Sequence, residues 1–169
     1  MKTKFKVIFT VTVILAITSW IITFYYWDKL PAVIPIHFGI DGQANGWADK
    51  SIWQVSFMPL IQTAMLALFV FVYNRPQYSN IPSTMWLMAL DKKQQQYAYD
   101  LIRTMNAGVS VFTGLLFTYI TYIMNFSALE SSQNLSVPII LSVVGLMLIW
   151  LTYWTIKIYK ITKKQIKSK

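Results

Sequence analysis

The chain contains no cysteine and only one histidine, His37. The absence of cysteine excludes disulfides, thiolate nucleophiles and metal sites built from Cys. A single histidine also excludes the paired His spacing of catalytic zinc sites, which take about three protein ligands. Acidic residues are few as well, 6 against 15 Lys and Arg, so the formal net charge is +9.

Charge is missing altogether from four long stretches, and every charged residue lies between them or near the chain ends. The uncharged stretches are 7–27, 51–74, 104–129 and 131–156. Each is as long as the roughly 20 residues with which an α-helix crosses a hydrocarbon core of about 30 Å. Buried helices of a soluble domain of this length would be shorter and would show a polar face. The sequence therefore predicts an all-α, multipass membrane protein.

Four transmembrane helices are expected, and we place them at about 7–27, 51–74, 104–127 and 136–157. These spans use more than half of the chain, so residues 1–169 are interpreted as a single integral membrane domain. The first apolar run is longer than the 7–15 residues or so of a signal peptide, which predicts an uncleaved helix.

The distribution of Lys and Arg predicts the orientation of the helices. Basic residues precede the first span, follow the last span and populate the middle connection, whereas the other two connections carry a small net negative charge. The positive-inside rule then places both termini and the middle connection in the cytoplasm, an N-in/C-in topology. We expect the basic tail to lie against anionic lipid headgroups rather than on nucleic acid.

Polar residues inside the spans predict how the helices pack. Gln62 falls near the middle of the membrane, where its amide needs a partner on another helix. Ser110 and Gly114 form a small-xxx-small pair, which predicts a packing face within the chain or, alternatively, a homodimer seam. No span contains an ionisable group at membrane depth, and this argues against an ion or proton transporter.

The middle connection contains further local signals. Asp91, with Gln94 three residues later, predicts the start of a helix that runs directly into the third span. Residues 80–84 have the composition of a turn. The apolar patch 85–90 is expected in the headgroup layer. Trp and Tyr residues near the span ends, Trp150 among them, are expected to anchor the helices at the membrane interface.

The first connection, residues 28–50, has unusual local chemistry. Prolines fix extended backbone, and Asp41-Gly42 and Asn45-Gly46 are turn dipeptides. The segment also carries apolar side chains that would need burial: Ile34, Ile36, Phe38 and Trp47. This pattern predicts a short, structured outer loop, a β-hairpin or tight turn that lies over the helix ends.

The same segment contains the pattern Leu-Pro-x-x-Ile-Pro-x-His-Phe-x-x-x-Gly, followed by Trp and by a Lys just before the second span. The residues are Leu30, Pro31, Ile34, Pro35, His37, Phe38, Gly42, Trp47 and Lys50. This motif, within 30–50, resembles a bacterial membrane domain of unknown function, family 1648 of that series, which extends roughly from the first helix through the second. The domain occurs in proteins similar to the immunity protein against a sporulation-delaying toxin. The resemblance implies the inner membrane of a bacterial cell and an immunity-like role.

The favoured hypothesis is a non-catalytic protein whose outer loop binds a toxin peptide or a lipid-like ligand, without cofactor, metal or nucleic acid. The candidate ligand-binding residues are Pro31, Pro35, His37, Phe38, Asp41, Gly42, Trp47 and Lys50. One alternative is an outer-leaflet enzyme that uses His37 as base or metal ligand, together with Asp41, Asp49 and Glu130. Another is a membrane anchor that holds a cytoplasmic regulator through Lys92 and Lys93. For His37 itself, the simpler role is a hydrogen bond that orders the loop.

Overall fold

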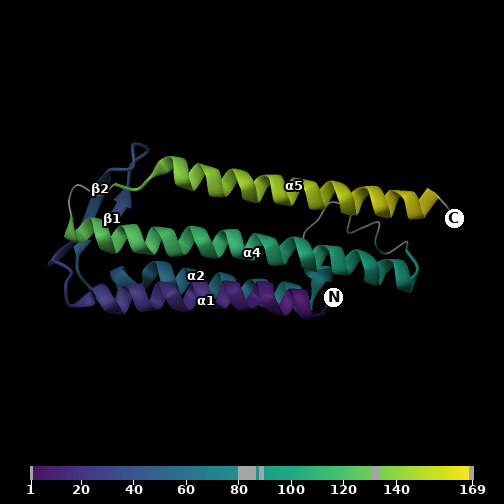
Figure 1. The fold of residues 1–169 in the computed structure, drawn as a ribbon, viewed down its shortest axis with the longest axis horizontal. Helices are drawn as coiled ribbons and strands as arrows, with labels where there is room; N and C mark the ends of the chain where they lie inside the picture. The colour runs from purple at the N-terminus through teal and green to yellow at the C-terminus, as the bar shows by residue number, and fades with distance from the viewer. Residues whose placement is uncertain (1, 80–86, 88–89, 131–133, 168–169) are drawn as a thin grey trace.

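The computed structural model describes residues 2–79, 87, 90–130 and 134–167. Long helices dominate these residues and alternate in direction, with one two-stranded hairpin at one end of the bundle (Figure 1). The elements in chain order are α1 (Lys2–Trp27), β1 (Val33–Phe38), β2 (Ala44–Asp49), α2 (Ile52–Asn74), the 3-10 turn η1 (Pro76–Tyr78), α4 (Lys92–Leu129) and α5 (Val137–Lys167). The turn predicted at 80–84 lies outside the described residues.

Four of the described helices are long and apolar enough to cross a membrane, namely α1, α2, α4 and α5. Their outward faces carry large exposed apolar side chains such as Ile14, Phe71 and Leu148. Soluble monomers rarely expose apolar surface of this extent, so lipid is the solvent that suits these helices. The prediction of a helical multipass membrane protein is confirmed.

Helix α4 is the centre of the bundle, because it contacts α1, α2 and α5. In Figure 1, α5 lies on the side of α4 opposite α1. The helix begins as predicted: Asp91 Oδ1 accepts a hydrogen bond from the Gln94 backbone N–H at 2.8 Å, and the Gln94 side chain accepts one from the Asp91 N–H. It then continues without interruption for 38 residues. At about 1.5 Å per residue it is roughly 57 Å long, well beyond the hydrocarbon core.

Hydroxyl and amide side chains form a polar seam where α1, α2 and α4 meet. Gln62 of α2 is only 2% exposed, and its Oε1 accepts a hydrogen bond from Ser19 Oγ of α1 at 2.6 Å. Its Nε2 donates to the Gly114 carbonyl at 3.2 Å and to Thr118 Oγ1 at 3.1 Å, both on α4. One amide therefore links three helices, which confirms that Gln62 faces other helices.

The small residues of α4 allow α1 to pack closely beside this seam. Thr12 Oγ1 of α1 lies 3.1 Å from Ser110 Oγ, and both residues are buried. A Cβ added to Gly114 would lie 3.0 Å from a methyl group of Leu15. The predicted packing face is confirmed. Because α1 of the same chain occupies it, this face is not free to form the homodimer seam that was the alternative.

At the end opposite the hairpin, α4 and α5 continue together beyond α1 and α2 as a two-helix projection (Figure 1). Its core is a cluster of buried apolar residues: Leu87, Leu90, Ala98, Leu101, Ile102, Met105 and Ile158. Of the apolar patch 85–90, Leu87 and Leu90 are buried in this core, where helix α4 and Ile158 of α5 cover them. The other residues of that patch lie outside the described part.

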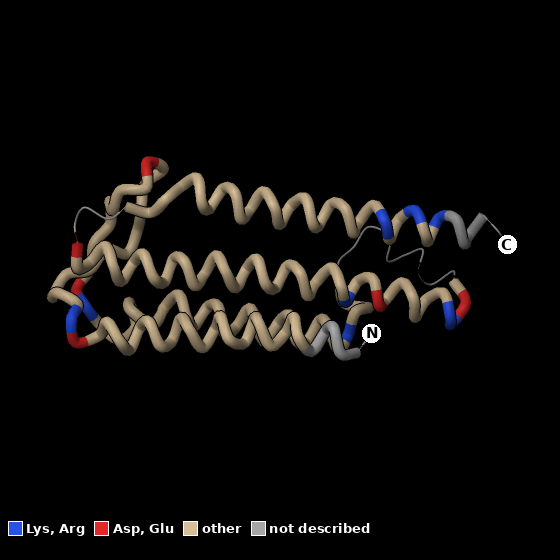
Figure 2. The backbone as a smooth tube through the Cα atoms, viewed as in Figure 1, with Lys and Arg blue, Asp and Glu red and all other residues tan. Residues whose placement is uncertain are grey.

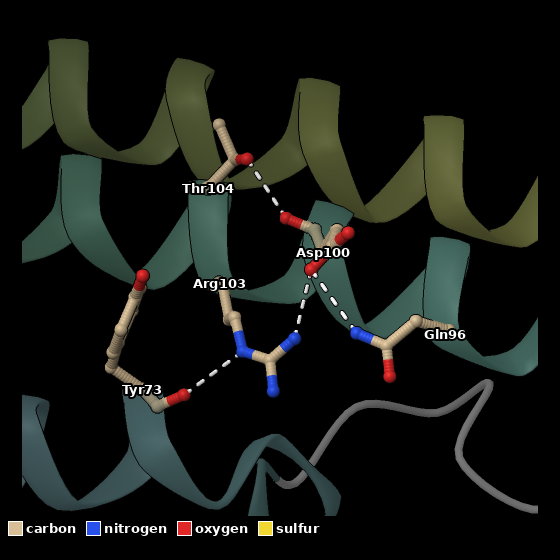
Figure 3. A network of polar contacts seen from close by, with 5 residues as sticks. All are labelled: Tyr73, Gln96, Asp100, Arg103 and Thr104. Carbon is tan, nitrogen blue, oxygen red and sulfur yellow. Dashed lines mark hydrogen bonds and ion pairs between the residues drawn. The ribbon is translucent and has the colours of Figure 1, made fainter. Parts of the chain in front are cut away.

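Arg103 joins the projection to helix α2. Its Nε donates to the Tyr73 carbonyl at 3.1 Å, and its Nη1 forms an ion pair with Asp100 Oδ1 at 2.8 Å (Figure 3). Gln96 also donates to that carboxylate oxygen, at 3.4 Å. Tyr73 lies in the last turn of α2, where the helix dipole is negative, so the guanidinium stabilises this helix end.

Candidate functional site at the hairpin

The hairpin is formed by antiparallel pairing of β1 and β2, with Ile34 opposite Ala48 and Pro35 opposite Trp47. The connecting turn closes through hydrogen bonds between Gly39 and Gln43 and from Gly42 N–H to the Gly39 carbonyl. Asp41 Oδ1 accepts a further hydrogen bond from the Gln43 N–H at 3.0 Å. The predicted hairpin and its Asp41-Gly42 turn are therefore confirmed.

The second predicted turn, Asn45-Gly46, is wrong, because both residues lie within strand β2. Gly46 pairs with His37 at an irregular point of the register. A Cβ on Gly46 would lie 2.8 Å from the His37 Cβ. The glycine is thus needed for close approach of the two strands at a bulge, a use that a dipeptide pattern cannot distinguish from a turn.

Lys50 attaches the base of the hairpin to the end of helix α1. Its Nζ donates to the carbonyl of Trp27 at 3.2 Å and to that of Leu30 at 3.0 Å. The ammonium also lies 5.2 Å from the centroid of the Trp27 ring. Carbonyls at a helix C-terminus lack partners within the helix and carry partial negative charge, so a lysine here stabilises the end of α1.

The turn of the hairpin is attached separately, to the backbone that precedes α5. The Leu135 N–H donates to the Gly42 carbonyl at 2.9 Å. Gly42 has a φ of +80°, and a Cβ at this position would overlap the Leu135 carbonyl oxygen. Only glycine satisfies both conditions without strain.

The inner face of the hairpin covers the ends of the helices. Leu30, Ile34 and Val55 form a buried cluster against Tyr26 and Trp27 of α1 and Ala128 of α4. Pro35 is also fully buried. Together with the contacts of Lys50 and Gly42, this cluster holds the hairpin in a fixed position over the ends of the helices.

The outer face of the hairpin carries apolar side chains that the fold leaves uncovered. Ile40, in the turn, is 97% exposed, Trp47 of β2 is 52% exposed, and Ile36 of β1 is also exposed. The expectation that Ile36 and Trp47 are buried is wrong, since both side chains are exposed. The register of β1 is irregular between Pro35 and His37, and burial along β1 does not alternate: the adjacent residues Ile34 and Pro35 are both buried. We call Ile36, Ile40 and Trp47 the apolar rim.

His37 is exposed, and its Nδ1 donates a hydrogen bond to Asn45 Oδ1 of the neighbouring strand. The hydrogen bond within the loop that was expected for His37 is therefore present. No group of three His, Asp or Glu side chains that could share a metal ion occurs among the described residues, so His37, Asp41, Asp49 and Glu130 do not converge there.

A small cavity of about 10 Å³ lies behind the hairpin, between β1, α2 and α4. Its volume is close to that of one water-sized group. Asn125 of α4 borders it, is 5% exposed and donates to the Thr121 carbonyl at 2.7 Å. Its Oδ1 is buried without a hydrogen-bond partner in the described part of the chain. The site thus contains a buried acceptor next to apolar walls that include Met58 and Met124.

The candidate ligand-binding residues divide into two groups by position. Pro35, Gly42 and Lys50 hold the hairpin in place, and Phe38 is half-buried. The exposed members are Pro31, His37, Asp41 and Trp47. Sequence reasoning assigned no site role to Ile40 or Asn125. Ile40 is an apolar residue beside a predicted turn, and this was a signal for a site role. Asn125 is 85 residues further along the chain than Ile40, and nothing in the sequence indicated that it lies near the hairpin.

Residues 14–63 match the family model of the domain of unknown function DUF1648. The matched segment begins within α1, includes the whole hairpin and ends within α2. All nine motif residues on which the resemblance was based lie inside the DUF1648 match, which confirms the resemblance for this segment. The chain matches no curated protein and no solved structure.

The structure gives physical roles to several residues of the DUF1648 segment. Leu30 and Ile34 form the buried cluster, Gly42 provides the backbone contact with Leu135, and Lys50 caps α1. Ser19 and Gln62, which form the shortest bond of the polar seam, also lie within 14–63. The DUF1648 segment is therefore a helix–hairpin–helix unit, and α4 supplies the surface on which it packs.

Proposed function

We propose that this protein is a non-catalytic membrane protein that binds a membrane-active peptide or a lipid-like ligand at its hairpin, as an immunity protein does. The observation that carries the proposal is the apolar rim, Ile36, Ile40 and Trp47, on a hairpin held at three places. A rigid surface with exposed apolar side chains loses little conformational entropy on binding, which favours affinity. The exposed indole of Trp47 is the kind of anchor that dominates binding interfaces.

The proposal places the hairpin outside the cell and both termini in the cytoplasm, in the inner membrane of a bacterium. Figure 2 supports this orientation, because Lys and Arg gather at the end of the bundle opposite the hairpin. The hairpin end carries Asp28, Asp41, Asp49 and Glu130 against Lys29 and Lys50. A membrane-active toxin that arrives from outside would meet the apolar rim first.

The test is survival of a toxin-sensitive bacterial host that expresses the protein, challenged with sporulation-delaying toxin and with other membrane-active peptides. The wild-type chain is expected to raise survival, and the double variant I40S/W47S is expected to lose that protection at an equal level in the membrane. Both side chains are exposed, so the fold should tolerate the changes. Gln43→Ala, also exposed on the hairpin but outside the rim, serves as the matched control. Unchanged survival with wild-type protein, or full protection by the double variant, would reject the proposal.

A further inference from the structure

Helix α5 changes from uncharged to basic near its C-terminal end, far from the hairpin. Its residues up to Ile156 are uncharged, and lysines follow at 157, 160 and 163. At this transition the helix borders a hollow of about 450 Å³, in the size range of roughly 300–1,000 Å³ that is usual for small-molecule sites. The described residues that line the hollow are Tyr153, Ile156, Lys157, Lys160 and Ile161.

The cationic part of the hollow is held in place but not neutralised. Lys157 Nζ lies 4.6 Å from the Trp154 ring centroid and 5.6 Å from that of Tyr153. Within the described residues, the one ion pair joins Arg103 to Asp100, so Lys157 and Lys160 have no carboxylate partner there. Two ammonium groups beside each other without a counter-charge favour an anionic ligand.

The apolar part of the hollow restricts the class of anion. Tyr153 and Ile156 are exposed and lie toward the membrane-spanning part of α5, one turn before the lysines. A free phosphate or a nucleic acid backbone gains nothing from these walls. A phospholipid gains from both parts, because its acyl chains lie at the level of the apolar residues and its phosphate lies at the level of the lysines.

We propose that this hollow is a binding site for one anionic phospholipid, with the phosphate at Lys157 and Lys160 and the start of the acyl chains against Tyr153 and Ile156. The site lies at the opposite end of the bundle from the hairpin and does not depend on the function proposed there. It adds a specific lipid contact to the general attraction between a basic tail and an acidic membrane surface.

The experiment compares lipid retention by the full chain, purified in neutral detergent, using native mass spectrometry. Phosphatidylglycerol and phosphatidylcholine with the same acyl chains are supplied in equal amounts. The wild-type chain is expected to retain one phosphatidylglycerol in preference to phosphatidylcholine. The variant K157Q/K160Q should lose this preference by about 5-fold for each lysine removed, from the affinity that a lysine near the surface adds.

The control variant is K92Q/K93Q, which removes the same charge from the same end of the molecule but outside the hollow. It is expected to retain the lipid preference. An equal loss in both variants would mean diffuse attraction to charge and would overturn the proposal. Displacement of the lipid by inorganic phosphate or by glycerophosphoglycerol at matched concentration would overturn it too, since the site would then recognise a free anion. Tight binding of an acidic peptide or RNA without lipid preference would have the same consequence.

Discussion

Ser19 Oγ lies 2.6 Å from Gln62 Oε1, and this contact joins the two helices that flank the hairpin. Two contacts therefore join parts of the DUF1648 segment to each other: Lys50 binds the C-terminal end of α1, and Ser19 of α1 binds Gln62 of α2. Since the amide nitrogen of Gln62 donates hydrogen bonds to α4, the position of the hairpin depends on how all three helices pack. Substitutions in the membrane-spanning part of these helices should therefore alter how the hairpin is held.

Replacing Gln62 with Leu is the direct test of the polar seam. The substitution keeps a similar volume but removes three hydrogen bonds to α1 and α4. Interhelical hydrogen bonds in membranes contribute roughly 0.6 kcal/mol each, so we expect the free energy of unfolding to fall by about 1–2 kcal/mol. The measurement is reversible unfolding in mixed micelles, followed by circular dichroism. Ala64→Leu, at a nearby exposed position of α2 that has no side-chain hydrogen bond to lose, is the control and should change stability little.

Removing the Lys50 ammonium should loosen the base of the hairpin. Lys50→Met keeps most of the side-chain length but removes both hydrogen bonds to the end of α1. We expect a loss of about 1–2 kcal/mol in stability, from the cap and its interaction with the helix dipole. Lys29→Met is the matched control, because Lys29 is exposed at the same end and lies over the Tyr25 ring. Equal effects of the two variants would contradict a capping role, since both remove one positive charge.

Gly42→Ala should detach the turn of the hairpin from the segment before α5. Alanine is strained at a φ of +80°, and its Cβ would overlap the Leu135 carbonyl oxygen. The backbone strain alone costs about 1 kcal/mol or more, and the overlap requires the turn to move. Limited proteolysis of intact, correctly inserted protein should then cut the hairpin faster than in the wild type. Gly145→Ala, where an added Cβ meets nothing within 4 Å, should leave the cleavage rate unchanged.

The elements with strong periodic or compositional signals were predictable from the sequence. An uncharged apolar run of this length is explained by a helix that crosses a membrane, and the structure has four such helices. Asp91 followed by Gln94 is typical of a helix N-terminus, and the structure has a capping box there. The polarity of Gln62 likewise required a partner, although it did not identify Ser19 or Thr118.

The parts of the site that depend on distant contacts were not predictable. Asn45-Gly46 has the composition of a turn, but its neighbour across the hairpin, His37, gives it a place in a strand. Leu87 and Leu90 are buried because the projecting part of α4 and Ile158 of α5 provide an apolar core for them. The exposure of Trp47 was not predictable either, because β1 and β2 pair with an irregular register and burial along β1 does not alternate from residue to residue.

Gly108 and Trp150 test whether α5 is held to α4 by one specific contact. The Trp150 Nε1 donates to the Met105 carbonyl at 3.1 Å, and its indole fills the space where a Gly108 side chain would lie. Trp150 therefore packs against α4 rather than serving as an interfacial anchor alone. Gly108→Val should displace the indole and destabilise the protein by roughly 1–3 kcal/mol, the usual cost of overpacking. The loss in the double variant Gly108→Val with Trp150→Ala should be smaller than the sum of the two single losses, since the smaller side chain removes the overlap. Thermal unfolding of the single and double variants in the same detergent measures the coupling between the two positions, and strictly additive losses would show that the contact does not hold α5.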